Sequence, residues 1–230
     1  MALFAIADLH LSFSTDKPMD IFGDHWANYE EKIKESWMAN IGQEDTVLIP
    51  GDISWAIRMD QAKADLDWIH DLPGHKILLR GNHDYWWTSL TKMQPLYPDI
   101  DFLQNNFYTY KDYAICGTRG WMSPNPTKFD DQDEKIHARE LIRLKLSLDQ
   151  AKKAGHDKII VMTHYPPTND RLDHSAFMDV YEEYGVERVI YGHLHTKSSF
   201  KTGLQGLVNG VLYQLTSCDF LGFEPLRIME

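Results

Sequence analysis

Five short apolar segments of this 230-residue chain each run into a turn that carries aspartate, asparagine or histidine. The turns read Asp8-Leu9-His10, Gly51-Asp52, Gly81-Asn82-His83-Asp84, Thr163-His164 and Gly192-His193-Leu194-His195. If the apolar segments are strands of an open α/β sheet, side chains just beyond their carboxyl ends converge on one crevice. The pattern therefore predicts an α/β fold with a polar site at the ends of its strands.

The rest of the chain supports this fold class, because helical stretches alternate with the apolar segments. We expect strands at residues 3–7, 46–50, 76–80, 158–163 and 187–191. We expect helices at about residues 25–40, 58–71, 88–96, 134–154 and 174–184. Residues 107–117 and 206–215 are typical of antiparallel hairpins, and the second contains the hairpin signal Asn209-Gly210.

The segment at about residues 118–133 contains two prolines and no periodic pattern, so we interpret it as a long surface loop. No repeat, low-complexity tract or change of composition marks a linker elsewhere. A chain of 230 residues can form one core. We therefore predict a single domain over residues 1–230.

The net charge of −11 disfavours a nucleic acid partner, although a bound metal ion can reverse the sign of the potential locally. No apolar run approaches the roughly 18 to 20 residues that span a bilayer, and the first residues do not resemble a cleavable signal. We predict a cytoplasmic protein without a membrane span. The two cysteines, Cys116 and Cys218, fit a reducing compartment as small buried residues.

Each of the five turns has an ordinary explanation when it is taken alone. Asp8 could cap a helix, Gly-Asp is a common turn, and His164 before two prolines could be a packed interior ring. These explanations do not account for five such turns in one chain, each at the end of an apolar segment.

Taken in order, the turns resemble the signature of the calcineurin-like metallophosphoesterases. That signature is Asp-x-His, Gly-Asp, Gly-Asn-His-Asp/Glu, a later single His, and Gly-His-x-His. The resemblance covers about residues 4–195 and points to the bacterial-type phosphohydrolases of the superfamily. It implies a four-layer αββα sandwich, in which two mixed β-sheets are flanked by helices and a binuclear metal site lies at the carboxyl ends of the strands.

The resemblance also implies a set of metal ligands with Asp52 as the bridge. One ion would be held by Asp8, His10, Asp52 and His195, and the other by Asp52, Asn82, His164 and His193. Carboxylate, imidazole and amide ligands suit divalent ions such as Mn²⁺, Fe²⁺ or Zn²⁺, and the lack of thiolates argues against a structural zinc site. Two ions about 3.5 to 4 Å apart can share a bridging hydroxide, which is the expected nucleophile.

Further residues receive roles from the same resemblance or from their positions. His83 is expected to donate a proton to the leaving oxygen or to stabilise the transition state. Asp84 would orient His83, although a helix N-cap explains Asp84 almost equally well. Arg119, Trp55 and Tyr165 are candidates for substrate contact, because a guanidinium matches phosphate and all three lie next to a motif or in the long loop. An ion pair and ordinary aromatic packing are their alternatives.

The second motif narrows the expected substrates. Protein serine/threonine phosphatases of this superfamily carry Gly-Asp-x-Val-Asp-Arg-Gly, whereas this chain reads Gly51-Asp52-Ile53-Ser54-Trp55-Ala56. We therefore predict a metal-dependent phosphoesterase that hydrolyses small-molecule or nucleotide phosphomonoesters or phosphodiesters. The alternatives are a catalytically silent binding scaffold of the same fold, which usually loses ligands that are all present here, and a nuclease, which the acidic charge disfavours. The sequence indicates no particular protein partner.

Overall fold

The computed structural model describes all 230 residues, which form two compact units. The first unit comprises Met1–Phe102 and Thr216–Glu230, and the second comprises Leu103–Leu215. Each unit has its own β-sheet and its own cluster of buried apolar side chains. The grouping of all residues into a single domain stays a prediction.

The first unit is built on a five-stranded mixed sheet of order β11-β1-β2-β3-β4. Its strands are β1 (Leu3–Ala5), β2 (Thr46–Pro50), β3 (His75–Leu79), β4 (Ile100–Leu103) and β11 (Leu226–Met229). Strands β1, β2 and β3 are parallel, and β11 pairs with β1 in the antiparallel direction. The three parallel strands end at the same edge of the sheet, where the first three motif turns begin.

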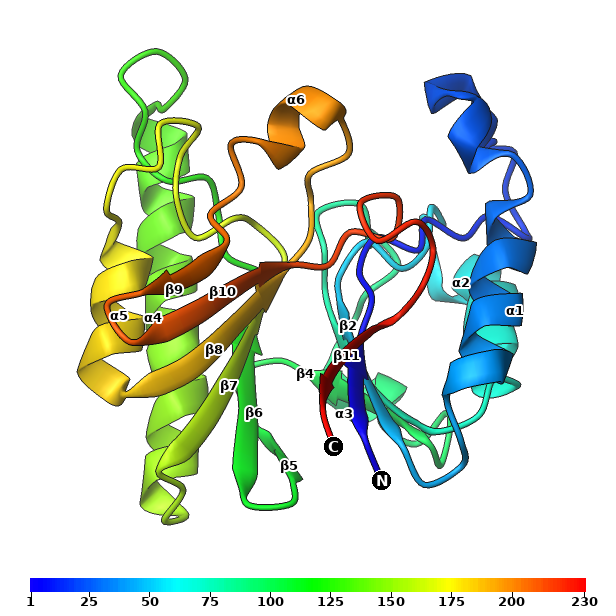
Figure 1. Ribbon diagram of the computed structural model, residues 1–230, viewed down its shortest axis with the longest axis horizontal. Helices are drawn as coiled ribbons and strands as arrows, with labels where there is room; N and C mark the ends of the chain where they lie inside the picture. Colours follow the sequence, from blue (N-terminus) through cyan, green and yellow to red (C-terminus); the bar gives the residue numbers. More distant parts are fainter. The chain divides into compact units, whose positions relative to one another are not determined.

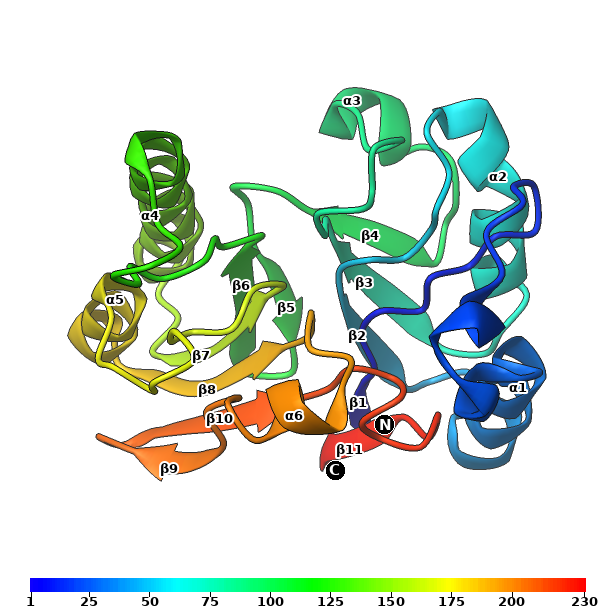
Figure 2. The same ribbon diagram turned by 90° about the horizontal axis from the view of Figure 1, so that it is seen from above.

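Two helices of the first unit, α1 (Tyr29–Asn40) and α2 (Met59–His70), lie on one face of this sheet (Figures 1 and 2). Each buries one apolar side, through Ile33 and Trp37 of α1 and through Leu66 and Ile69 of α2. Two short 3-10 helices, η1 (Met19–Phe22) and η2 (Asp24–Trp26), precede α1. Helix α3 (Leu90–Met93) is a single turn.

The second unit contains a six-stranded mixed sheet of order β5-β6-β7-β8-β10-β9. Its strands are β5 (Tyr108–Tyr110), β6 (Tyr113–Thr118), β7 (Lys158–Thr163), β8 (Val186–Tyr191), β9 (Gly206–Val208) and β10 (Val211–Leu215). Strands β6, β7, β8 and β10 are parallel, and the two predicted hairpins add β5 and β9 at the edges. The last two motif turns follow β7 and β8 at their carboxyl ends.

The longest helix of the second unit, α4 (Asp131–Lys153), lies with α5 (Ala176–Tyr184) on one face of that sheet (Figure 1). The side chain of Asp130 caps α4 by accepting the N–H groups of Gln132 and Asp133. Gly185 ends α5 in the left-handed conformation, with φ of 67°. Helix α6 (Lys197–Phe200) is a short turn after the last motif.

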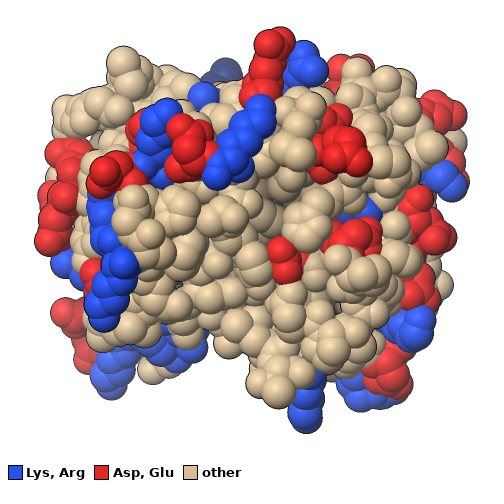
Figure 3. All heavy atoms as spheres, turned by 90° about the horizontal axis from the view of Figure 1, so that it is seen from below, with Lys and Arg blue, Asp and Glu red and all other residues tan.

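The prediction of two mixed sheets flanked by helices is confirmed. Two strands, β4 and β11, and helix α6 were not expected from the sequence. The loop between β6 and α4 spans residues 119–130, close to the predicted range. None of the helices combines the length and apolar content that a bilayer span requires. On the face drawn in Figure 3, basic and acidic side chains lie mostly toward the margin in separate groups, and no continuous basic stripe is visible.

Candidate metal centre

The turns after β1 and β2 lie side by side beyond the ends of their strands. The N–H of Asp8 donates to the carbonyl oxygen of Gly51, and the N–H of His10 donates to that of Asp52, both at 2.9 Å. These bonds continue the ladder between the strands past their last paired residues. The side chains of Asp8, His10 and Asp52 are all buried. The first unit therefore holds three of the predicted ligands in two connected turns.

These turns use a backbone conformation that is rare outside glycine. The φ angles of Asp8, His10 and Asp52 are 61°, 46° and 50°, and in the second unit His193 has a φ of 74°. A residue held in this left-handed region costs about 1 kcal/mol or more, and such residues cluster at functional sites. Four predicted ligands share this conformation, so the local strain coincides with the motifs.

The carboxylate of Asp52 is held by the turn that follows β3. Its Oδ1 accepts the backbone N–H of His83 at 2.8 Å, and its Oδ2 lies 3.8 Å from Nε2 of His10. A Cβ atom on Gly81 would lie 2.1 Å from the same Oδ1, so only glycine allows this approach. The third motif thus touches the second through backbone as well as side chains. Its predicted ligand Asn82 is half-buried in the same turn.

The carboxylate of Asp84 accepts four hydrogen bonds that the sequence did not predict. Its Oδ1 accepts hydrogen bonds from the backbone of Ile53 and Ser54 and from the Trp86 indole, at 2.9, 3.1 and 3.0 Å. Its Oδ2 accepts the N–H of Gly81 at 2.7 Å. The fully buried carboxylate therefore ties the second motif turn to the third, and its orientation of the His83 ring stays a prediction. Burial and the charge of Asp52 raise the pKa of Asp84, and the backbone donors oppose that shift.

The ring of His83 is positioned by aromatic contact. It lies 4.4 Å from the Trp55 ring and 5.8 Å from the His10 ring. Trp55 in turn stacks on His10 at 4.9 Å, with 23° between the ring planes. His83 is half-buried, and its ring is tilted by 52° against that of Trp55. Trp55, a predicted substrate contact, thus belongs to the candidate centre of the first unit.

The second unit brings two predicted ligands into direct proximity. Nδ1 of His193 lies 3.2 Å from Nε2 of the fully buried His164. The backbone places them: His164 donates its N–H to the carbonyl oxygen of Arg119, and Gly192 donates to that of His164 at 3.2 Å. His195 is half-buried, two residues further along the same turn.

Two candidates for substrate contact lie around this pair. The Tyr165 ring is 4.2 Å from the His193 ring and 4.9 Å from that of Trp121. The Arg119 guanidinium lies 4.7 Å from the centre of the Trp121 ring and 3.7 Å from the buried carboxylate of Glu140. The ordinary alternatives named above, aromatic packing and an ion pair, are thus both present. Arg119 remains 16% exposed.

One residue at the centre had no recognisable signal in the sequence, and a second had a role that the sequence did not indicate. Cys218 donates its Sγ–H to the carbonyl oxygen of Asp8 at 3.0 Å, across 210 positions of the chain. Gly81 was part of a motif, but its close approach to Asp52 could not be predicted. Cys218 is fully buried, and burial raises the pKa of its thiol well above the usual value.

The residues present fit divalent metal ions. Two nitrogen ligands bound at about 2.1 Å to one ion are separated by about 3.0 to 3.4 Å in octahedral or tetrahedral geometry. The 3.2 Å between the His164 and His193 nitrogens lies in this range. In the first unit, Asp8 and Asp52 supply buried carboxylates, a ligand type that manganese and iron accept together with imidazole.

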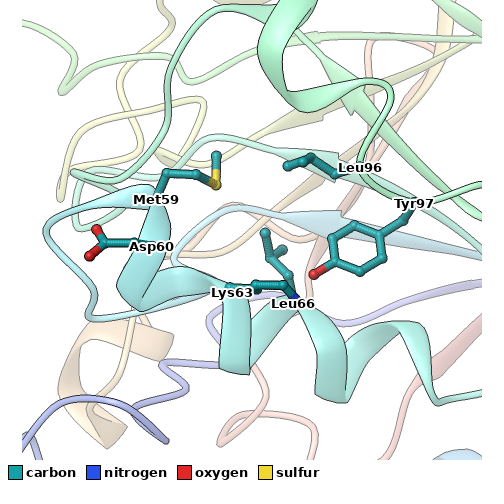
Figure 4. Close-up of a pocket in the computed structure, with 6 residues that line it drawn as sticks. All are labelled: Met59, Asp60, Lys63, Leu66, Leu96 and Tyr97. Carbon is teal, nitrogen blue, oxygen red and sulfur yellow. The ribbon is translucent and has the colours of Figure 1, made fainter.

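A separate cavity of the first unit lies against α2 and has a volume of about 300 Å³ (Figure 4). It is lined by Met59, Asp60, Lys63, Leu66, Leu96 and Tyr97. The Tyr97 hydroxyl donates to Oδ1 of Asp67 at 2.5 Å beside it. None of the predicted site residues lines this cavity, so it is distinct from the candidate centre.

Comparison with known proteins identifies the family of this chain and two relatives. A family model described as calcineurin-like phosphoesterase matches residues 1–197, which include all five motif turns. The chain is 36% identical to the Gene 66 protein of Mycobacterium phage L5 over 78 residues, 34% of this chain and 37% of that protein. It is 25% identical to the Gene 66 protein of Mycobacterium phage D29 over 174 residues, 75% of this chain and 69% of that protein.

Among solved structures, the chain is similar to the phosphopantetheinyl hydrolase of Mycobacterium tuberculosis. The TM-score is 0.58 with 14% sequence identity, over 94% of this chain and 88% of the hydrolase. At this identity the likeness shows a shared fold.

Proposed function

Since the chain belongs to the calcineurin-like phosphoesterase family, we propose that it hydrolyses phosphomonoesters or phosphodiesters with the help of two divalent metal ions. The substrates are small molecules or nucleotides, because the second motif lacks the arginine of the protein phosphatases. Manganese, iron and zinc are the ions that suit the ligand types.

In this proposal the metal ligands are the seven residues that the sequence motifs supply. Those of the first unit are Asp8, His10, Asp52 and Asn82, and those of the second are His164, His193 and His195. Only Asp8 and Asp52 are carboxylates, so two divalent ions leave the ligand set with a positive charge. This local charge attracts phosphate to a chain whose net charge is −11.

Each remaining residue has a stated task. When bound, the two ions supply a water of lowered pKa and neutralise the phosphoryl oxygens. His83 holds a proton for the leaving oxygen, since it is only half-buried and its ring is positioned by Trp55 beside the ligand His10. Asp84 keeps the turns of Asp52 and His83 in register through its four hydrogen bonds.

Arg119 and Tyr165 are proposed to contact the substrate. A guanidinium can hold two phosphate oxygens at once, and Arg119 is kept in place by Glu140 and Trp121. Its carbonyl oxygen accepts the N–H of both His164 and Tyr165 at 3.0 Å, so the arginine is fixed to the turn that carries a ligand.

One observation carries the proposal beyond family membership. The nitrogens of His164 and His193 face each other at 3.2 Å, the separation expected for two ligands of one metal ion. One hydrogen bond between two neutral imidazoles would also occupy both nitrogens, so metal titration of His164→Ala is the measurement that separates the two interpretations of this pair.

The direct test is a panel of phosphoesters on metal-depleted protein, with Mn²⁺, Fe²⁺, Zn²⁺ and Mg²⁺ added back separately. We expect no turnover without metal, restoration by at least one of these ions, and a stoichiometry approaching two ions per chain by elemental analysis. Retention of full activity after exhaustive metal depletion would contradict the proposal.

Two variants test the site assignment. His83→Ala should lower kcat by about 100-fold or more while metal stoichiometry is kept, because only the proton donor is lost. Asn82→Ala should weaken metal binding. His156→Ala, another half-buried histidine, serves as the control and should retain wild-type kcat. If both motif variants keep wild-type turnover, the assignment is wrong; bound metal without turnover of any ester would favour the binding scaffold.

A further inference from the structure

A second cavity of the first unit, of about 270 Å³, lies next to Trp55. It is lined by Asp16, Lys17, Pro18, Met19, Ile21, Phe22 and Trp55. Six of these residues belong to η1 or to the segment just before it, and none is a predicted metal ligand. We call this space the η1 cavity.

Trp55 connects the η1 cavity to the candidate centre. One face of its indole covers His10 at 4.9 Å, and its ring lies 4.4 Å from that of His83. Its Nε1–H points toward Sδ of Met19, at 3.3 Å, on the side of the cavity. A group in the η1 cavity would therefore share a wall with the ring proposed to protonate the leaving oxygen.

The wall formed by Trp55 is fixed before any ligand arrives. The N–H of Trp55 donates to the carbonyl oxygen of Leu11 at 2.9 Å. The preceding residue, Ser54, donates its hydroxyl to the buried carboxylate of Asp65. The same hydroxyl oxygen accepts the N–H of Ala56, the residue after Trp55, at 3.0 Å. Such preorganisation lowers the cost of ordering a binding site.

The opposite wall is apolar and exposed. Ile21 and Phe22 are adjacent in η1 and are 73% and 60% exposed, whereas Met19, which also lines the cavity, is buried. Neighbouring large apolar side chains that border a cavity indicate a binding surface. Asp16 and Lys17 at the edge carry opposite charges, so the edge offers no net charge to a second phosphate.

We propose that the η1 cavity binds the apolar part of the alcohol in the phosphoester substrate, an aryl or branched alkyl group. This inference rests on the proposed function, because it places the phosphoryl group at the metal centre and the leaving alcohol on the Trp55 side. A dry cavity of about 150 Å³ already accommodates benzene, so 270 Å³ accepts a ring with a short alkyl chain.

The test compares phenyl phosphate with para-butylphenyl phosphate, each as the monoester and as its methyl diester. The two esters react alike at phosphorus and differ only in apolar length. Because each buried methylene contributes up to about 0.8 kcal/mol, we expect kcat/KM to be about tenfold higher for the butyl ester, mainly through a lower KM.

Variants of the exposed wall should remove this preference. Ile21→Ser and Phe22→Ser are each expected to lower the ratio of kcat/KM for the butylphenyl ester to that for the phenyl ester about fivefold, because the butyl group then contacts polar atoms. Leu96→Ser is the matched control: Leu96 is 45% exposed and lines the cavity of Figure 4, which has a similar volume. It should leave the ratio unchanged.

A second readout does not depend on turnover. The affinities of benzylphosphonate and para-butylbenzylphosphonate are measured by calorimetry on the metal-loaded wild type and on the same variants, and the same order is expected. If neither ester is hydrolysed with any metal, the proposed function fails, and the phosphonate affinities alone decide the inference. The inference is overturned if the wild type shows a butyl-to-unsubstituted ratio near one, in kcat/KM or in phosphonate affinity, or if Ile21→Ser and Phe22→Ser leave that ratio unchanged.

Discussion

A Cβ atom added to Gly81 would lie 2.1 Å from Oδ1 of Asp52 and 2.2 Å from its backbone nitrogen. Gly81→Ala must therefore move the carboxylate proposed to bridge two ions. We expect a loss of stability of about 1 to 3 kcal/mol and metal affinity lowered at least tenfold. Chemical denaturation and metal titration measure the two effects.

The control for this change is Gly42→Ala. Gly42 has an ordinary φ, and the atom nearest to a Cβ added there, Oδ2 of Asp45, would be 3.7 Å away. That variant should bind metal like the wild type. Unchanged metal affinity in Gly81→Ala would show that the third motif tolerates displacement from the second.

Asp84→Asn distinguishes a structural carboxylate from an orienting one. An asparagine keeps one acceptor oxygen, and its NH₂ would face either the Gly81 donor or the donors of Ile53, Ser54 and Trp86. We expect a stability loss of about 1 to 3 kcal/mol in denaturant unfolding. A variant of wild-type stability with an altered pH profile of kcat would instead support the orientation of His83.

Both cysteines should be unreactive in the native protein. Burial raises the pKa of Cys116 to about 12, and it raises that of Cys218 well above its usual range. Since the thiolate is the reactive form, native labelling by a thiol reagent at about pH 8 should be negligible, and two thiols should react after denaturation. Rapid native labelling would show that one thiol is accessible.

Asp65 should make stability depend on pH. Burial raises the pKa of its carboxyl above the usual 3.8, against the hydrogen bonds from Ser54 and Phe13. At a pH between the pKa of the unfolded state and the raised pKa of the folded state, the folded state binds more protons than the unfolded state. The free energy of unfolding therefore falls as pH rises through this range. Asp65 therefore stabilises the folded state most at a pH below its pKa in the unfolded state, and least at a pH above its raised pKa in the folded state.

The variant Asp65→Asn removes that titration. Its free energy of unfolding, relative to the wild type, should therefore increase from about pH 4 to about pH 7 in urea denaturation. A constant offset from lost hydrogen bonds does not alter this slope. A difference that stays flat over the range would mean that the carboxyl titrates normally.

The sequence predicts the placement of the motifs because that placement depends on local pattern. Asp8 and Asp52 follow apolar runs that become parallel strands, and parallel strands end at one edge. Helix α3 shows where such patterns mislead: the expected helix extended past Pro95, which cannot donate to the preceding turn, and α3 ends at Met93. Strand β11 becomes recognisable only through its pairing with β1.

Contacts between residues that are far apart in the sequence could not be predicted from local patterns. In the sequence, Asp84 stands next to His83, so a pairing of neighbours was the natural interpretation. The fold instead brings it the N–H of Ile53, 31 positions earlier in the chain. Likewise, nothing local to Cys218 indicates a bond to the carbonyl oxygen of Asp8. Both cases depend on how turns pack, which residue type and spacing do not encode.

The left-handed turns have a consequence for variants selected by heat tolerance alone. Glycine adopts positive φ without steric cost, so it would relieve the backbone at Asp8, His10, Asp52 and His193. It would also remove a proposed ligand each time. A library sorted only by melting temperature should therefore accumulate glycine at the exposed Asn209, also left-handed, and not at the buried Asp52, where glycine would leave the N–H of His83 without its acceptor.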